Sequence, residues 1–173
     1  MPVDRIKTGK ILIVDDNEDL LKAARIFLKR NFKQVDIEKT PESIPALLKN
    51  DNYDVILLDM NFTKDVSSGH EGFLWLEKIL EIDPSAVVIL ITAYGDVQMA
   101  VKAIKEGAMD FILKPWENER LLATVNSAMQ LRKSKMEVND LKDKQKQITS
   151  DIDHKFQDVI GSSSAMQRIF QTI

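Results

Sequence analysis

The sequence predicts an α/β fold: a doubly wound sheet of five parallel strands, followed by a long helical linker. Four apolar runs are rich in β-branched residues and too continuous for half-exposed strands, so they predict strands buried on both faces; they lie at 11–14, 54–58, 86–91 and 109–113. A weaker, alternating run at 35–40 predicts a fifth strand nearer an edge. Helical periodicity fills the segments between the runs. This alternation of strand and helix is typical of a parallel sheet covered on both faces.

The helical periodicity occurs in five segments, at 18–30, 41–50, 72–82, 96–107 and 117–132. Thr40 followed by Pro41 predicts a helix start, and Gly107 follows the apolar face of its segment as a helix stop. Each helical segment separates two predicted strands or follows the last one, as a doubly wound sheet requires.

Composition excludes several classes of function. The 173 residues, 44% hydrophobic, suffice for one domain with a core and some additional chain. A formal net charge of −3 argues against a dominant nucleic-acid surface, and the absence of cysteine excludes disulfides, zinc thiolate sites and thiol catalysis. No apolar run is long enough to span a membrane, and residues 1–10 lack the apolar core of a signal peptide. We therefore expect a cytoplasmic protein without a membrane partner.

The composition changes at about residue 129. Residues 129–155 are polar, contain no proline or glycine, and predict a helical linker. Five apolar residues follow a three–four spacing, with Ser134 and Gln145 as polar interruptions: Leu131, Val138, Leu141, Ile148 and Ile152. This pattern favours a short coiled coil of about three heptads; a solvated linker helix is the alternative.

Chemically active side chains stand at the carboxyl ends of the predicted strands. Asp15 and Asp16 follow the first strand, Asp59 the third, Thr92 the fourth and Lys114 the fifth. In an open parallel sheet these ends meet at one rim, where ligands bind. Each residue alone has a structural explanation, such as a turn or a helix cap, but four matching strand ends together indicate a site.

Three carboxylates at one rim indicate a bound cation. Hard oxygen ligands without histidine or cysteine favour Mg²⁺, held by Asp16, Asp59 and a backbone carbonyl beyond Asp59, with Asp15 acting directly or through water. An ionised aspartate can attack phosphorus without a general base. Asp59 is the best placed of the three because it ends the central strand. Lys114 and Thr92 would then stabilise the transferred phosphoryl group.

Four motifs resemble those of response-regulator receiver domains from two-component signalling. They are "ILIVDDNED", "DVILLDMN", "VVILITAYGD" and "AMDFILKPW", in the family's order and spacing across about residues 8–128. The resemblance implies a flavodoxin-like receiver domain at 1–128 that acts as a signalling phosphoacceptor rather than an enzyme.

The resemblance also implies the role of each residue. Asp59 would be the phosphoacceptor, Asp15 and Asp16 would organise Mg²⁺, and the backbone carbonyl of Asn61 would complete the metal site. Thr92 and Lys114 match the family's hydroxyl and lysine, and Phe111 its switch aromatic; core packing alone also explains Phe111. A sensor histidine kinase or a phosphotransfer protein would be the partner that delivers the phosphoryl group.

The segment after Asp59 departs from the family. The loop at 62–71 is about five residues longer than usual, and Thr63 replaces a common proline. We expect a mobile excursion through Ser67, Ser68 and Gly69. His70 reads as a surface residue. Tyr94, two residues after Thr92, is expected at the rim, where it would limit the access of water to the site; an incidental rim aromatic is the alternative.

The last segment, 156–173, resembles the start of the AAA+ ATPase domain of NtrC-type activators, which work with sigma-54 RNA polymerase. No G-x-x-x-x-G-K-[ST] motif occurs, so the nucleotide site is missing from this chain. DNA, ATP and RNA polymerase would be contacted only through domains missing here. The resemblance further implies a homodimer formed through the receiver face and the linker helix.

Two alternatives differ in class from a phosphoacceptor. The first is a magnesium-dependent phosphatase that works through an aspartyl phosphate, but such enzymes usually carry a second acid two residues after the nucleophile, where this chain has Asn61. The second is a pseudo-receiver that binds partners without phosphorylation. The intact acids, Thr92 and Lys114 argue against it.

Overall fold

The computed structural model describes residues 7–62, 70–95, 97–162 and 168. The chain divides into two units, residues 1–134 and residues 135–173, and the sheet lies in the first. The strands are β1 (Thr8–Val14), β2 (Phe32–Glu38), β3 (Val55–Asp59), β4 (Val88–Thr92) and β5 (Asp110–Leu113). The helices are α1 (Glu18–Leu28), a 3₁₀ turn at Pro41–Ser43, α2 (Ile44–Asn50), α3 (His70–Ile82), α4 (Val97–Lys105) and α5 (Asn118–Ser162).

The five strands form one parallel sheet in the order β2-β1-β3-β4-β5. The order reverses between β1 and β3, which places the ends of these two strands at the switch point of the fold. Val14 of β1 pairs with Leu58 of β3, so the next residues, Asp15 and Asp59, lie at the same level at the carboxyl ends of the two strands. The predicted doubly wound fold is confirmed.

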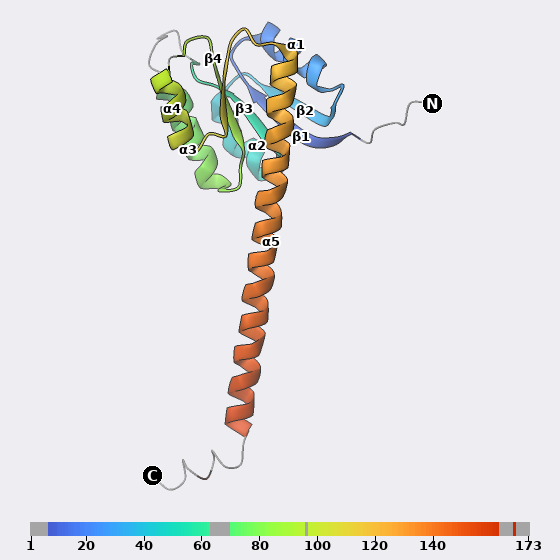
Figure 1. Cartoon of the computed structure of the whole chain (residues 1–173), viewed down its shortest axis with the longest axis vertical. Coiled ribbons are helices and arrows are strands. Elements are labelled where there is room, and N and C mark those ends of the chain that lie inside the picture. Colours follow the sequence, from blue (N-terminus) through green and yellow to red (C-terminus); the bar gives the residue numbers. More distant parts are fainter. Residues whose placement is uncertain (1–6, 63–69, 96, 163–167, 169–173) are drawn as a thin grey trace, which may run out of the picture. The chain divides into compact units, whose positions relative to one another are not determined.

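Helices cover both faces of the sheet (Figure 1). On one face, α1 and the first turns of α5 pack against alternate strand residues such as Ile11, Leu57 and Ile89. On the other face, α2, α3 and α4 pack against the intervening residues, such as Leu12 and Leu58. Successive residues of β1, β3 and β4 point to opposite faces of the sheet, and helices cover both faces, so these strands are buried on both sides.

The two outer strands differ from each other in how well the sequence predicted them. The strand predicted at 35–40 is β2, which begins at Phe32 and lies at an edge, as expected. The strand predicted at 109–113 is β5, and its expected burial on both faces is wrong: Leu113 is 43% exposed, and Asp110 and Phe111 are half-buried. An outer strand has a neighbour on one side only, which leaves part of it accessible to solvent.

The helix predicted at 117–132 continues through the linker as α5 and reaches Ser162. The predicted domain boundaries at 128/129 and 155/156 both fall inside this helix. No end of a helix coincides with either boundary, so both boundaries stay predictions. The expected excursion through Ser67, Ser68 and Gly69 lies outside the described residues, as does most of the segment after residue 162.

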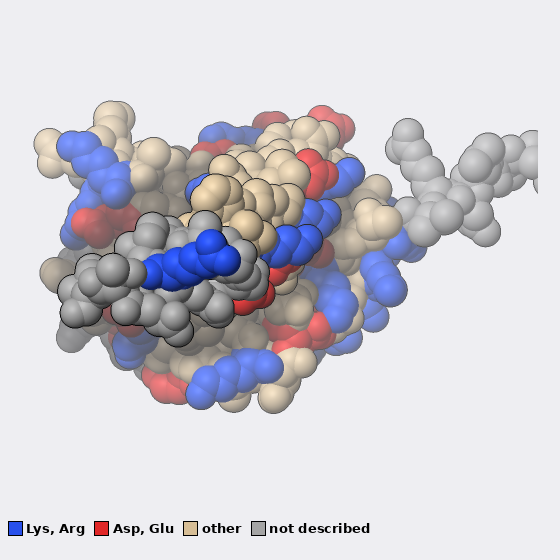
Figure 2. Space-filling model, turned by 90° about the horizontal axis from the view of Figure 1, so that it is seen from below, with Lys and Arg blue, Asp and Glu red and all other residues tan. Residues whose placement is uncertain are grey.

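Among the described residues, no helix combines the length and the apolar character needed to cross a bilayer. On the face seen in Figure 2, basic and acidic side chains lie interspersed with uncharged ones. This distribution agrees with the small net charge of −3.

Candidate functional site

Three carboxylates meet at the carboxyl ends of β1 and β3. One ligand oxygen from each of Asp15, Asp16 and Asp59 lies within 4.8 Å of the others. Asp15 and Asp59 are buried, whereas Asp16 is exposed at the mouth of the cluster. The structure therefore brings together the three acids that the strand ends predicted, with two of them withdrawn from water.

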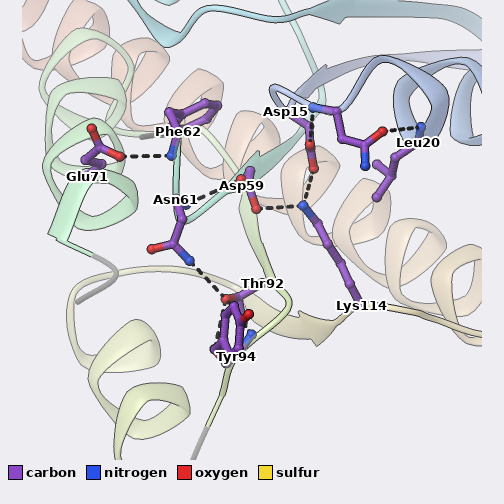
Figure 3. Close-up of polar contacts among 10 residues, drawn as sticks. Asp15, Leu20, Asp59, Asn61, Phe62, Glu71, Thr92, Tyr94 and Lys114 are labelled. Atoms are coloured by element: carbon purple, nitrogen blue, oxygen red, sulfur yellow. Dashed lines mark hydrogen bonds and ion pairs between the residues drawn. The ribbon is translucent and has the colours of Figure 1, made fainter. Parts of the chain in front are cut away.

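The ammonium group of Lys114 sits between the two buried acids (Figure 3). Its Nζ lies 2.8 Å from Asp59 Oδ1, to which it donates a hydrogen bond, and 2.5 Å from Asp15 Oδ2. The backbone N–H of Lys114 also donates to the carbonyl oxygen of Thr92, at 2.7 Å, and this bond ties the end of β5 to the end of β4. The lysine thus reaches the cluster from a strand two places away from β3.

The proton affinity of the cluster follows from this packing. Burial raises the pKa of Asp59 from 3.8 to about 6, the hydrogen bond from Lys114 opposes the rise, and the negative charge of Asp15 adds to it. Burial alone would lower the pKa of Lys114, but its hydrogen bonds to Asp15 and Asp59 outweigh that effect, so its pKa is raised. Lys114 is therefore a cation at neutral pH, and Asp59 is mostly ionised there.

The donor set fits a magnesium ion. Three carboxylates and one ammonium leave an excess of two negative charges, which a divalent cation would neutralise. All the candidate ligand atoms are oxygens, the type that Mg²⁺ prefers.

Thr92 ends β4 beside the cluster and is fully buried. Its hydroxyl donates to the carbonyl oxygen of Tyr94 at 2.8 Å and accepts from the Tyr94 N–H at 3.1 Å. The side-chain amide of Asn61 donates to the same hydroxyl at 3.5 Å (Figure 3). The hydroxyl is therefore engaged by its own loop and by the loop after Asp59. Tyr94 itself is exposed at the rim, where the sequence placed it.

Two contacts fix the start of the loop after Asp59. The backbone N–H of Asn61 donates to Asp59 Oδ2 at 3.4 Å, and that of Phe62 donates to Glu71 Oε2 at 2.9 Å. Gly72 lets the first turn of α3 approach the backbone of Met60 closely, because a Cβ at this position would lie 2.6 Å from the Cα of Met60. His70 begins α3 and is exposed, which agrees with its reading as a surface residue.

Sequence reasoning missed two residues that shape the site. Asn17 caps α1 through its side chain, and its backbone N–H donates to Asp15 Oδ1 at 2.8 Å, which orients that carboxylate. Asparagine before an acidic first turn is a helix-start signal that could have revealed this role. Glu71 left no such signal, because a loop separates it from Phe62 along the chain.

Phe111 lies on β5 and is half-buried. It packs against the core between the sheet and α2, α3 and α4. Its ring also lies close to the backbone of Gly95, where a Cβ would come within 2.7 Å of two ring atoms. The aromatic ring thus connects the core to the loop that follows Thr92.

These features together define a class of protein: the chain belongs to the response regulator receiver domain family of two-component systems. The family profile matches residues 11–126, which is more than half of the chain.

Particular relatives agree with this assignment. The C4-dicarboxylate transport transcriptional regulatory protein DctD of Rhizobium meliloti (strain 1021) is 30% identical over 164 residues, which cover 94% of this chain and 33% of DctD. The chain thus spans about a third of that relative's length.

Two solved structures are also similar. The N-terminal signal receiver domain of a two-component response regulator from Bacteroides fragilis is 43% identical, with a TM-score of 0.64, over 71% of this chain and 98% of that one. The beryllofluoride-activated NtrC4 receiver domain dimer is 33% identical, with a TM-score of 0.65, over the same shares of the two chains.

Proposed function

We propose that this receiver domain accepts a phosphoryl group on Asp59 from a sensor histidine kinase or a phosphotransfer protein. The observation that carries the proposal is the position of Asp59. Its carboxylate ends the central strand β3, lies in the acidic cluster with Asp15 and Asp16, and is held at Oδ1 by the Lys114 ammonium. No other described acid combines these features.

In the proposed reaction, an oxygen of Asp59 forms a bond to phosphorus as the bond from phosphorus to the donor breaks. Oδ2 is the better-placed oxygen. Lys114 binds Oδ1, whereas the hydrogen bond that Oδ2 accepts from the described residues is the long one from the Asn61 N–H. With a pKa of about 6, Asp59 is mostly ionised at neutral pH and needs no general base. The Lys114 ammonium lies beside the acceptor carboxylate, where it would stabilise the negative charge on the phosphoryl oxygens.

A bound Mg²⁺, held by Asp15, Asp16, Asp59 and the Asn61 carbonyl, would supply positive charge to the phosphoryl oxygens. Asn17 keeps Asp15 oriented toward the cluster through its backbone N–H. The burial of Asp15 and Asp59 limits the access of water to the acceptor carboxylate.

Phosphorylation would change the surroundings of Thr92. Its hydroxyl must give up its bonds to Tyr94 and Asn61 before it can reach a new phosphoryl oxygen. The loop after Thr92 carries Gly95, whose backbone lies close to the Phe111 ring, so we infer that a move of this loop also moves the aromatic ring. Thr92 and Phe111 are thus the proposed switch residues.

We further propose that the chain is part of an NtrC-type transcriptional activator, in which phosphorylation controls dimerisation or assembly. DctD, a transcriptional regulatory protein, aligns with 94% of the chain, including the linker region. In this scheme residues 1–128 are the receiver, 129–155 the linker, and 156–173 the start of an AAA+ domain. DNA, ATP and RNA polymerase would be partners of the remaining domains. A cytoplasmic location is part of the scheme, because a transcriptional regulator works where the DNA is.

Homodimerisation through the receiver face and the linker helix completes the proposal. A similar receiver domain, that of NtrC4, has been solved as a beryllofluoride-activated dimer. In this chain α4 carries exposed apolar side chains at Val97, Val101 and Ile104, and Leu113 of β5 is also exposed. These residues are suited to an interface on the receiver face.

The test is incubation with Mg²⁺ and acetyl phosphate, read by intact mass. We expect one phosphoryl group on the wild-type chain and none on Asp59→Asn. Asp54→Asn is the matched control, because Asp54 precedes β3 at the opposite end of the strand and should not affect acceptance. Turnover of small phosphomonoesters would instead support a phosphatase, and an unmodified wild-type chain would support a pseudo-receiver.

A further inference from the structure

The first turn of α3 holds the backbone that would complete the metal site. The carbonyl oxygen of Met60 accepts the Gly72 N–H at 3.1 Å. The N–H of Phe62 donates to Glu71 Oε2 at 2.9 Å. Both contacts come from the same turn of the helix. Asn61, whose carbonyl is the proposed backbone ligand of Mg²⁺, is therefore flanked by two residues that the start of α3 anchors.

A glutamate in the first turn of a helix has a general explanation, because a negative charge there interacts favourably with the helix dipole. That effect depends on the charge and not on the direction in which the carboxylate points. In this structure the Glu71 carboxylate points at one particular backbone N–H, that of Phe62 (Figure 3). Because this N–H belongs to the same peptide group as the Asn61 carbonyl, the contact can act on the site as well as on the helix.

The contact restricts the direction of the Asn61 carbonyl. The peptide between Asn61 and Phe62 is trans, so its C=O and its N–H lie in one plane and point in opposite directions. Glu71 holds the N–H, and the carbonyl must then point away from Glu71. In the view of Figure 3, Glu71 and Asp59 lie on opposite sides of this peptide. The carbonyl is thus directed to the side on which the acidic cluster lies.

We propose that Glu71 is a positioning residue for Mg²⁺: by accepting the Phe62 N–H, it holds the Asn61 carbonyl in the direction that the ion requires. The inference rests on the metal site of the proposed function and adds to it a residue from α3. Mg²⁺ demands nearly ideal octahedral geometry, so a ligand that is oriented before the ion arrives binds it more tightly than one that must be ordered. Without an acceptor at residue 71, the Phe62 N–H would turn to another partner such as water, and the carbonyl would turn with it.

A Mg²⁺ titration of the whole chain, followed by the chemical shifts of the backbone amides, tests the proposal. Glu71→Ala removes the acceptor and should raise the Kd for Mg²⁺ by about tenfold. Glu71→Gln removes the charge but keeps an oxygen that can accept the Phe62 N–H, and its Kd should stay within about threefold of wild type. Equal losses of affinity in the two variants would overturn the proposal, because the charge of Glu71 would then be what matters.

Two controls separate positioning from a general effect. Glu77→Ala removes an exposed acid from the same helix and should leave the Kd within about twofold of wild type; a loss as large as that of Glu71→Ala would overturn the proposal. Denaturant unfolding in EDTA reports the stability of each variant without metal. A Glu71→Ala protein that is less stable than wild type but binds Mg²⁺ equally well would also overturn it, because Glu71 would then serve the fold alone.

A measurement on the wild-type chain does not depend on how well any variant folds. If the bond from Phe62 to Glu71 favours Mg²⁺ binding, then Mg²⁺ must favour that bond by the same factor. Saturating Mg²⁺ should therefore slow the hydrogen exchange of the Phe62 amide by up to about tenfold. An exchange rate that Mg²⁺ leaves unchanged would contradict the coupling.

Phosphorylation is read separately, by the intact mass after acetyl phosphate. A Mg²⁺ affinity that depends on Glu71 as predicted, in a chain whose Asp59 accepts no phosphoryl group, would sink the proposed function and leave the role of Glu71 intact. Phosphorylation of Asp59 in a chain whose Mg²⁺ affinity ignores Glu71→Ala would do the reverse.

Discussion

Asp59→Asn should make the metal-free protein more stable at pH 7.5, although it removes the proposed phosphoacceptor. The folded-state pKa of Asp59, about 6, lies above its ordinary value of 3.8, so the folded protein holds this proton more tightly than the unfolded chain does. Ionisation therefore costs stability, and the cost grows as the pH rises from about 4 to about 6. Asparagine has nearly the same shape as aspartate and carries no charge, so it removes the cost.

The magnitude follows from the shift. One pKa unit equals about 1.4 kcal/mol, so the shift of Asp59 from 3.8 to about 6 corresponds to about 3 kcal/mol once the carboxyl is fully ionised. The stabilising effect of Lys114 is already included, because the pKa is the net result of burial, Lys114 and Asp15. At pH 5 the same relation gives about half of this cost.

The assay is denaturant unfolding in EDTA, followed by the fluorescence of Trp75 and Trp116, which both lie in the first unit. We expect Asp59→Asn to unfold with a free energy about 3 kcal/mol higher than wild type at pH 7.5, and with an advantage about half as large at pH 5. Asp140→Asn, which changes an exposed acid of α5, should change neither value. Added Mg²⁺ should stabilise the wild type and reduce the advantage of the variant.

The reasoning would be refuted if Asp59→Asn were less stable than wild type in EDTA at pH 7.5. It would also be refuted by an advantage that increased toward pH 5, because that would mean a folded-state pKa below 3.8. Either result would indicate that the attraction between Asp59 and Lys114 outweighs the burial of the carboxylate.

Two further substitutions test contacts that hold the receiver together. Gly72→Ala should lower the unfolding free energy by about 1–3 kcal/mol, because the new Cβ meets the backbone of Met60, which cannot move without displacing the residues after Asp59. Leu74→Ala, at an exposed position of α3, is the control. Equal losses of stability in the two variants would contradict the close approach of Gly72 to Met60. Arg132→Met removes the ion pair between Arg132 Nη1 and Asp83 Oδ2, which are 2.8 Å apart, and the arginine is buried. We expect the unfolding free energy to fall by about 1–3 kcal/mol in the same assay. Lys133→Met, on the exposed face of the helix, should change it little. An Arg132→Met protein as stable as wild type would show that this pair contributes nothing.

Much of the site could be predicted from the sequence because a parallel sheet imposes its own geometry. The carboxyl ends of all five strands leave the sheet at one edge, so knowing which residue follows each strand suffices to gather Asp15, Asp59, Thr92 and Lys114 there. The edge position of β2 was equally readable, since its residues alternate instead of forming a continuous apolar run. These are local signals, carried by neighbouring residues.

Other features depend on contacts between distant segments and left no local signal. The run in β5 has the composition of an inner strand, yet its place at the edge follows from the order in which the strands pair. The buried Arg132 lies in a polar stretch of α5 and is matched to Asp83 only in three dimensions. The same is true of Glu71, whose carboxylate reaches the backbone of Phe62.

The sequence by itself determined the alternation of strands and helices, the identity of the groups at the strand ends and the heptad spacing in α5, because each is set by the order of side chains along the backbone. The tertiary structure decided how those groups meet. It placed the Lys114 ammonium between Asp15 and Asp59, turned the Thr92 hydroxyl toward Tyr94 and Asn61, and buried the carboxylate of Asp59 enough to raise its pKa. The reason is physical: burial, charge pairing and hydrogen-bond direction depend on distances through space.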